Sequence, residues 1–72
     1  MHEIVIHTEF IKLDAFLKFT AAVSTGGEAK IVISEGMVFV NGAICTQRGK
    51  KIRPGDAVTL EGTEYLCKSE AP

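Results

Sequence analysis

The most informative part of the chain is the segment 36–43, which reads Gly36-Met37-Val38-Phe39-Val40-Asn41-Gly42-Ala43. A short apolar run with valines at alternate positions predicts a strand over residues 37–40. The Asn-Gly pair that follows is the strongest short-range signal of a hairpin, because both central positions of a type I′ turn need a positive φ. We therefore expect residues 43–46 to pair back onto residues 37–40.

Two short helices are predicted upstream of this hairpin. Apolar residues recur with helical spacing at Leu13, Phe16, Leu17 and Ala21, which predicts a helix over residues 14–22. The sequence Thr25-Gly26-Gly27-Glu28 then has the spacing of a capping box, with Thr at the N-cap and Glu three residues later. We expect a second helix of about ten residues to begin there and to end at Gly36.

Strands are predicted on both sides of the helices and the hairpin. Residues 2–7 alternate as a strand does, and a type II turn at Arg53-Pro54-Gly55-Asp56 precedes strands over residues 57–60 and 64–68. The order of elements places the protein in the α+β class. We expect an N-terminal strand and two short helices packed on a small antiparallel sheet.

Length and composition exclude several classes of protein. The chain has 72 residues, 46% of them hydrophobic and 24% charged, which suits a single domain over residues 1–72 with its core in 12–60. Apolar runs of three or four residues are too short to span a membrane, and no signal-type segment opens the sequence, so we expect a cytoplasmic protein. Two cysteines and two histidines make neither a disulfide framework nor a metal site, and no catalytic motif is present. We expect no enzymatic activity, metal or cofactor.

Positive charge is concentrated in the middle of the chain. The formal net charge is −1, yet residues 30–53 hold five cationic side chains and a single carboxylate, while acidic residues outnumber basic ones on either side. Arg48, Lys50, Lys51 and Arg53 lie within seven residues without an acidic residue between them. Such a segment favours contact with a polyanion, although a solvated loop has the same composition.

The start of the second helix offers a further place for an anion. A helix N-terminus presents unpaired N–H groups and the positive end of the helix dipole, and two glycines let an anion approach the backbone. Thr25, Gly26 and Gly27 would form this seat, with Lys12, Lys18 and Lys30 as additional cations. The glycines are also consistent with a tight connection between helices, and the lysines with ordinary solvated charges.

These motifs together resemble the S-four type RNA-binding domain, which has the αL fold. Its helix-start pattern is similar to Lys12-Leu13-Asp14, and its second helix to Thr25-Gly26 and Ala29-Lys30. Its Gly-x-Val-x-Val-Asn-Gly run matches residues 36–42, and its closing pattern matches Ile52-Arg53-Pro54-Gly55-Asp56. The resemblance runs without a gap from Lys12 to Val58. Gly26 stands where many members have an arginine, a form that looks like the small free-standing bacterial proteins of this type.

The resemblance implies a protein that binds structured RNA, with ribosomal RNA or a ribosome-associated RNA favoured. We expect the protein to recognise the shape and phosphates of RNA, because few aromatic side chains are free to stack on bases. The aromatic residues, including Phe10, Phe19 and Phe39, are expected in the core or partly buried. Phe39 lies opposite the valines of its strand and can be exposed. The alternative is a small protein-interaction module that uses the sheet face or the acidic C-terminal third. We expect a monomer. The expected RNA-contacting residues are Lys12, Lys18, Thr25, Gly26, Gly27, Lys30, Arg48, Lys50, Lys51 and Arg53.

Overall fold

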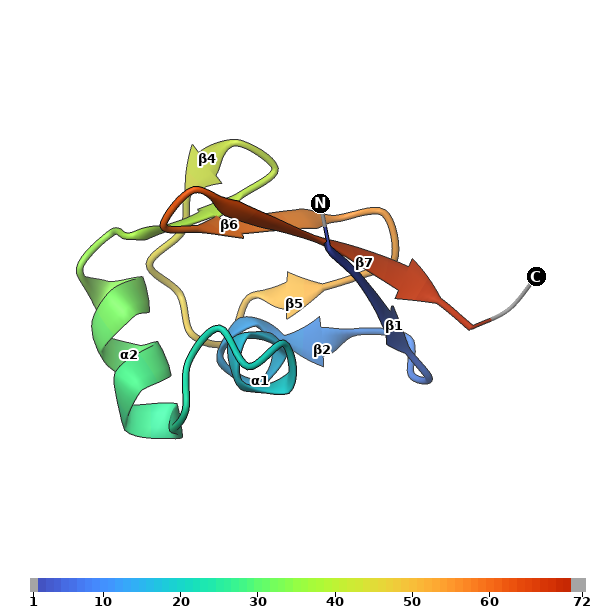
Figure 1. The fold of residues 1–72 in the computed structure, drawn as a ribbon, viewed down its shortest axis with the longest axis horizontal. Coiled ribbons are helices and arrows are strands. Elements are labelled where there is room, and N and C mark those ends of the chain that lie inside the picture. Colours follow the sequence, from blue (N-terminus) through green and yellow to red (C-terminus); the bar gives the residue numbers. More distant parts are fainter. Residues whose placement is uncertain (1, 71–72) are drawn as a thin grey trace.

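The computed structural model describes residues 2–70, which form two helices and seven strands. The elements in chain order are β1 (His2–Ile6), β2 (Ile11–Lys12), α1 (Leu13–Phe19), α2 (Gly26–Ser34), β3 (Val38–Val40), β4 (Ala43–Ile44), β5 (Lys51–Ile52), β6 (Ala57–Leu60) and β7 (Thr63–Ser69). Five strands make one sheet in the order β1-β7-β6-β3-β4, and β2 pairs with β5 in a separate ladder. Both helices and the β2–β5 ladder lie on one side of the larger sheet (Figure 1). The α+β architecture is as the sequence predicts.

The larger sheet is mixed rather than wholly antiparallel. Strands β3, β4, β6 and β7 pair antiparallel, as expected, but β1 joins the edge in parallel with β7, in a register that places Ile4 opposite Cys67. A parallel pair needs a crossover connection, and here the crossover is everything between β1 and β7, including both helices. The two ends of the described chain are thereby brought to neighbouring strands.

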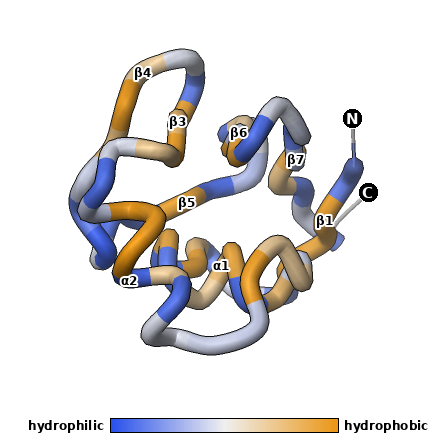
Figure 2. Tube along the Cα trace, turned by 60° about the vertical axis from the view of Figure 1, so that its left-hand side comes forward, coloured by the Kyte–Doolittle hydropathy of each residue, from blue (hydrophilic) through white to orange (hydrophobic). Residues whose placement is uncertain are grey.

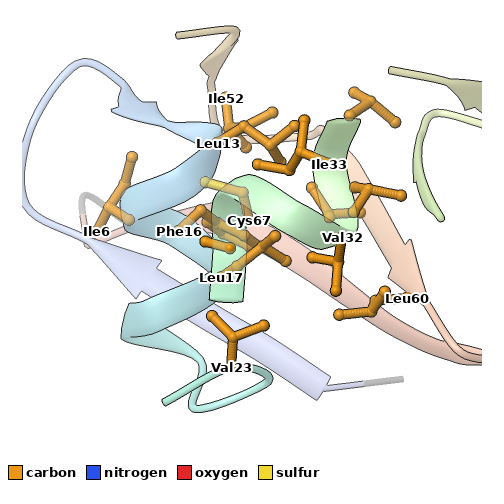
Figure 3. Packing of buried hydrophobic residues seen from close by; sticks show 14 residues of the cluster. Ile6, Leu13, Phe16, Leu17, Val23, Val32, Ile33, Ile52, Leu60 and Cys67 are labelled. Atoms are coloured by element: carbon orange, nitrogen blue, oxygen red, sulfur yellow. The ribbon is translucent and has the colours of Figure 1, made fainter. Parts of the chain in front are cut away.

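The core lies between the inner face of this sheet and the helices. Its fully buried side chains include Phe16 and Leu17 from α1, Ile33 from α2, and Cys67 from β7 (Figure 3). Helix α2 buries Ala29, Val32 and Ile33 against the sheet and α1. None of the described helices is long and apolar enough to cross a membrane.

Helix α1 is shorter than predicted: it ends at Phe19 rather than at residue 22. The Thr20 hydroxyl donates to the Leu17 carbonyl and accepts from the Ala22 amide, and Ala21 takes a positive φ of 63°. Local bonds from a threonine hydroxyl compete with the helical ladder in this way. Ala21 is consequently exposed, and Val23 occupies the core in its place.

Helix α2 begins as predicted. Thr25 is the N-cap, and its hydroxyl accepts from the Glu28 amide at 3.1 Å. The Glu28 carboxylate bonds the amide of Ser24 at 2.7 Å, one residue before the usual partner in a capping box. At the other end of the helix, Gly36 has the expected left-handed φ of 75°.

The predicted hairpin is also present. Asn41 and Gly42 have φ values of 52° and 84°, as a type I′ turn requires. The Asn41 side chain also donates to the Asp56 carboxylate at 3.1 Å and accepts from the Ala57 amide at 2.9 Å, which ties the hairpin to the turn before β6. In that turn Gly55 has a φ of 100°, and the Asp56 amide bonds the Arg53 carbonyl at 2.9 Å, as expected of type II.

The return strand β4 is shorter than the predicted range 43–46. It contains only Ala43 and Ile44, although the Cys45 amide still bonds the Val38 carbonyl. Beyond Cys45 the chain leaves the sheet and runs down toward β5 (Figure 1). Although β4 is apolar, it lies at the edge of the sheet, away from α1 (Figure 2). The Ile44 side chain is 60% exposed.

Candidate nucleic-acid interface

The β2–β5 ladder is the centre of the basic surface. Ile11 pairs with Ile52, and Lys12 pairs with Lys51. Ile52 is fully buried, and because successive side chains of a strand point to opposite faces, Lys12 and Lys51 both face solvent. Like charges directly opposite one another destabilise a strand pair. The ladder therefore holds two lysines together against their mutual repulsion.

The basic loop is fastened to the start of α1 through its backbone. The Lys50 amide bonds the Gln47 carbonyl at 3.2 Å and closes a turn. The Lys50 and Arg48 carbonyls accept from the amides of Leu13 and Asp14, at 2.9 and 3.2 Å. These bonds satisfy N–H groups that a helix N-terminus otherwise leaves unpaired. The loop backbone is thus held in place while the side chains of Arg48 and Lys50 are exposed.

Phe10 lies beneath two of the cations, whereas the sequence predicts it only as a core or partly buried side chain. The Lys51 ammonium is 4.9 Å from the centre of the Phe10 ring, and the Arg53 guanidinium carbon is 5.7 Å from it. Both distances are in the range of a cation–π interaction. Phe10 is half-buried, and with β5 it positions Lys51 and Arg53 on one surface. No local sequence signal indicates this contact, because it depends on the pairing of β2 with β5.

A second basic group surrounds the start of α2. The Lys18 side chain approaches within 4.0 Å of the point where Gly26 would carry a Cβ atom. Lys30 is four residues after Gly26 and so lies on the same face of the helix. The Gly26 and Gly27 amides bond no acceptor within residues 2–70, but the Glu28 carboxylate lies at this helix end as well. The predicted residues Thr25, Gly26, Gly27, Lys18 and Lys30 are therefore neighbours. The prediction that Lys12 belongs with them is wrong, because Lys12 pairs with Lys51 in the β2–β5 ladder.

Helix α1 connects the two groups. Lys12 is its N-cap and Lys18 lies in its last turn, a separation of about 9 Å along the helix axis at 1.5 Å per residue. We use the name basic face for the two groups together, and its members are Lys12, Lys18, Lys30, Arg48, Lys50, Lys51 and Arg53. All seven side chains are exposed.

No member of the basic face forms an ion pair with a carboxylate of residues 2–70. In that part of the chain the Lys68 ammonium pairs with the Glu3 carboxylate, and the His7 imidazole contacts the Glu70 carboxylate. Lys68 is thus the single lysine or arginine outside the basic face, and it is also the one that has an acidic partner. The positive charge of the basic face remains available to an external anion.

The metal-ligating and thiol side chains of the described residues are dispersed. Within residues 2–70 no three His, Cys, Asp or Glu side chains come together as a metal site would need. Cys45 and Cys67 are free thiols. Burial, with a smaller contribution from the charge of Asp56, raises the pKa of the Cys67 thiol, so this side chain is a poor nucleophile.

The aromatic side chains differ in one respect from the expectation. Phe16 is fully buried, but Phe19 is 59% exposed, because it is the last residue of α1 and lies on the side away from the core. The prediction that Phe19 is buried or partly buried is therefore wrong. Phe39 is exposed on the outer face of the sheet, as its position opposite Val38 and Val40 allows.

Comparisons with known proteins identify the family of the chain. A family model described as an S4 domain matches residues 4–68. A probable ribosome maturation protein of Bacillus subtilis (strain 168), RlbA, is 44% identical over 57 residues, which cover 79% of this chain and 80% of that protein. The solution structure of YbcJ from E. coli, described as revealing an αL motif involved in RNA binding, superposes with a TM-score of 0.73 at 30% identity. The match covers 94% of this chain and 87% of YbcJ. The chain therefore belongs to the S4 domain family, the S-four type that its motifs resemble.

Proposed function

We propose that this protein binds structured RNA through phosphate contacts made by the basic face. Ribosomal RNA or a ribosome-associated RNA is the favoured target, and the protein acts as a cytoplasmic monomer without catalytic activity. Membership of the S4 domain family, the RNA-binding αL motif described for YbcJ and the ribosome maturation role assigned to RlbA support this proposal.

The observation that carries the proposal is the unpaired charge of the basic face. Lys12 and Lys51 lie opposite each other in a two-residue ladder, and the side chains of Arg48, Lys50 and Arg53 are exposed nearby without an acidic partner among residues 2–70. This arrangement destabilises the isolated protein but suits a ligand with closely spaced negative charges. A phosphate backbone is such a ligand, and its binding releases condensed counterions.

Recognition by shape and phosphate is favoured over recognition of single strands. Binding of unpaired strands uses aromatic side chains on which successive bases stack. The aromatic ring that contacts cations of the basic face is that of Phe10, which is half-buried beneath Lys51 and Arg53. Phe19, which follows Lys18 in α1, is exposed, but one ring does not make a series of stacking platforms. A folded RNA, with its phosphates fixed in space, fits this surface better than a flexible strand.

The test is a titration of a folded ribosomal RNA fragment at several salt concentrations. If about four to six phosphates are neutralised, the logarithm of affinity falls with the logarithm of salt concentration at a slope of about −3 to −5. The variant Arg48→Glu/Lys50→Glu/Lys51→Glu removes most of the affinity. It stays folded, because only the Lys51 contact with Phe10 is lost, at a cost of about 0.5–1 kcal/mol.

Lys68→Glu is the control for the single variant Lys50→Glu, since each changes the net charge by −2 and Lys68 lies outside the basic face. We expect its RNA affinity to remain within about threefold of the parent, a difference below 1 kcal/mol. Unchanged RNA affinity in the triple variant contradicts the assignment of the basic loop.

A protein-interaction module is the second candidate, favoured by the outer face of the sheet. Phe39 and Ile44 lie opposite each other in the β3–β4 pair, and both are exposed. A partner docked on this face would bind with little dependence on salt, and the triple glutamate variant would still bind it. The same salt titration therefore separates the two candidates.

A further inference from the structure

A pocket of about 340 Å³ opens beside the basic loop, between the β3–β4 hairpin and the chain that descends from it. Its apolar wall includes Val40, Ala43 and Ile44, and its polar wall includes Thr46 and Gln47. Lys50 also lines the pocket and is at the same time a member of the basic face. The pocket therefore adjoins the basic face at Lys50.

We propose that this pocket receives a single unpaired nucleotide of the bound RNA, with the base against the aliphatic wall and its phosphate near Lys50. The proposal rests on the proposed function, because the nucleotide arrives as part of an RNA held by the basic face. Sequence-specific recognition of RNA targets unpaired nucleotides, whose bases can be turned out of the helix. The pocket thereby adds a contact with a base to a surface that otherwise recognises only phosphates.

The size and chemistry of the pocket suit a base. Its volume is at the lower end of the range for small-ligand sites, roughly 300 to 1,000 Å³. An extruded base is held by aromatic or apolar side chains against its faces and by hydrogen bonds at its edge. Ala43, which is exposed in this wall, would be covered when a base packs against it.

The hydrogen-bonding groups needed at the edge of a base are free. The Thr46 hydroxyl and the side-chain amide of Gln47 bond no partner within residues 2–70. A Gln amide supplies both a donor and an acceptor, the pair that a base edge requires. Asn41 also lines the pocket, but its amide is already bonded to Asp56 and Ala57 and acts as a fixed wall.

The rim of the pocket is held in place before any ligand binds. The Cys45 amide bonds the Val38 carbonyl at 2.9 Å, and the Lys50 carbonyl accepts from the Leu13 amide at 2.9 Å. The turn that starts at Gln47 is closed by the Lys50 amide at 3.2 Å. A site fixed in this way loses little conformational freedom on binding, so its contacts contribute more fully to affinity.

The test compares two RNA hairpins with the same stem, one fully paired and one with a single bulged nucleotide. We expect the protein to bind the bulged stem roughly tenfold more tightly, and Thr46→Val/Gln47→Ala to remove that preference while affinity for the paired stem is unchanged. Thr59→Val is the matched control, because Thr59 pairs with Phe39 away from the pocket. It leaves the preference intact.

Alkylation of Cys45 gives a second and independent measurement. Cys45 lines the pocket and is half-buried, whereas Cys67 is fully buried and serves as an internal control. A saturating amount of the bulged stem slows the alkylation of Cys45 by iodoacetamide at least fivefold, and a saturating amount of the paired stem leaves the rate near that of the free protein.

The possible failures are distinguishable. If both stems bind equally tightly, or protect Cys45 equally, the nucleotide pocket is refuted while RNA binding stands. If neither stem nor any other folded RNA binds, the proposed function fails and the pocket assignment fails with it.

Discussion

The two glycines at the start of α2 allow a sharp test of whether this helix end binds phosphate. Neither Gly26 nor Gly27 has a left-handed φ, and a Cβ atom at Gly27 would meet only the Thr25 hydroxyl oxygen at 3.8 Å, an ordinary contact. Alanine therefore fits without strain, and Gly27→Ala stabilises the fold by about 0.4–1 kcal/mol through the lower entropy of the unfolded chain.

The expected change in melting temperature follows from the size of the protein. An unfolding entropy of ~2.1 cal/mol/K per residue gives about 150 cal/mol/K for 72 residues, so Gly27→Ala raises the melting temperature by about 3 to 7 °C. Gly27→Asp also favours the helix dipole, although Glu28 already places a carboxylate nearby, so we expect its melting temperature to be at or above that of the parent.

RNA binding responds in the opposite direction. The added methyl group crowds an anion on the Gly26 and Gly27 amides, and the added carboxylate repels it, so both variants bind RNA more weakly and Gly27→Asp loses roughly tenfold, about 1.4 kcal/mol. Ser34→Asp, at the other end of α2, makes the same change in charge and serves as the control.

The assay is a thermal melt paired with an RNA titration at fixed salt. Two results would refute the reasoning. If both Gly27 variants melt higher and bind RNA as tightly as the parent, the start of α2 seats no phosphate. If both melt much lower, the glycines are required by the backbone alone.

Three further predictions concern the hairpin, the buried thiol and the aromatic support of the basic face. Asn41→Val lowers the free energy of unfolding by about 2–4 kcal/mol in chemical denaturation, because it loses two side-chain hydrogen bonds and strains a positive φ. Asn41→Gly loses only the hydrogen bonds, so equal effects of the two variants would argue against backbone strain. The raised pKa of Cys67 favours the neutral thiol in the folded state, so the free energy of unfolding is unaffected below the ordinary thiol pKa of 9.0. Above that pH it declines by up to about 1.4 kcal/mol per pH unit. Cys67→Ala melts lower but shows a shallower decline of stability with pH, and an identical decline would contradict this assignment. Phe10→Ala removes the surface beneath Lys51 and Arg53 and weakens RNA binding at low salt, whereas Phe39→Ala on the outer sheet face leaves it unchanged.

Several elements were predictable because their causes are local. The N-cap at Thr25 depends on a hydroxyl and an amide three residues apart. The Asn41-Gly42 turn depends on the φ preferences of adjacent residues, and the turn that contains Gly55 is closed by a bond between residues three apart. Each of these features is specified within four residues, and each is where the sequence places it.

Features that depend on distant partners were not predictable in this way. Strands β2 and β5 have two residues each, too few to show alternation, and they form only because Ile11 and Ile52 meet over the core. The parallel pairing of β1 with β7 requires the whole intervening chain to fold back. Helix α1 ends early because the Thr20 hydroxyl bonds its own helix and Val23 gains a place in the core.

The candidate site also combines features that are local in the sequence with features that depend on distant contacts. By itself the sequence determined the cations, since four of them lie within seven residues and composition is independent of folding. Only the tertiary structure decided that Lys12 lies opposite Lys51, that Lys18 approaches Gly26, and that Phe10 supports two cations. The physical reason is that charge is a property of each residue, whereas phosphate binding depends on the distances between charges. Those distances are fixed when the core is buried, through contacts between residues that are far apart in the chain.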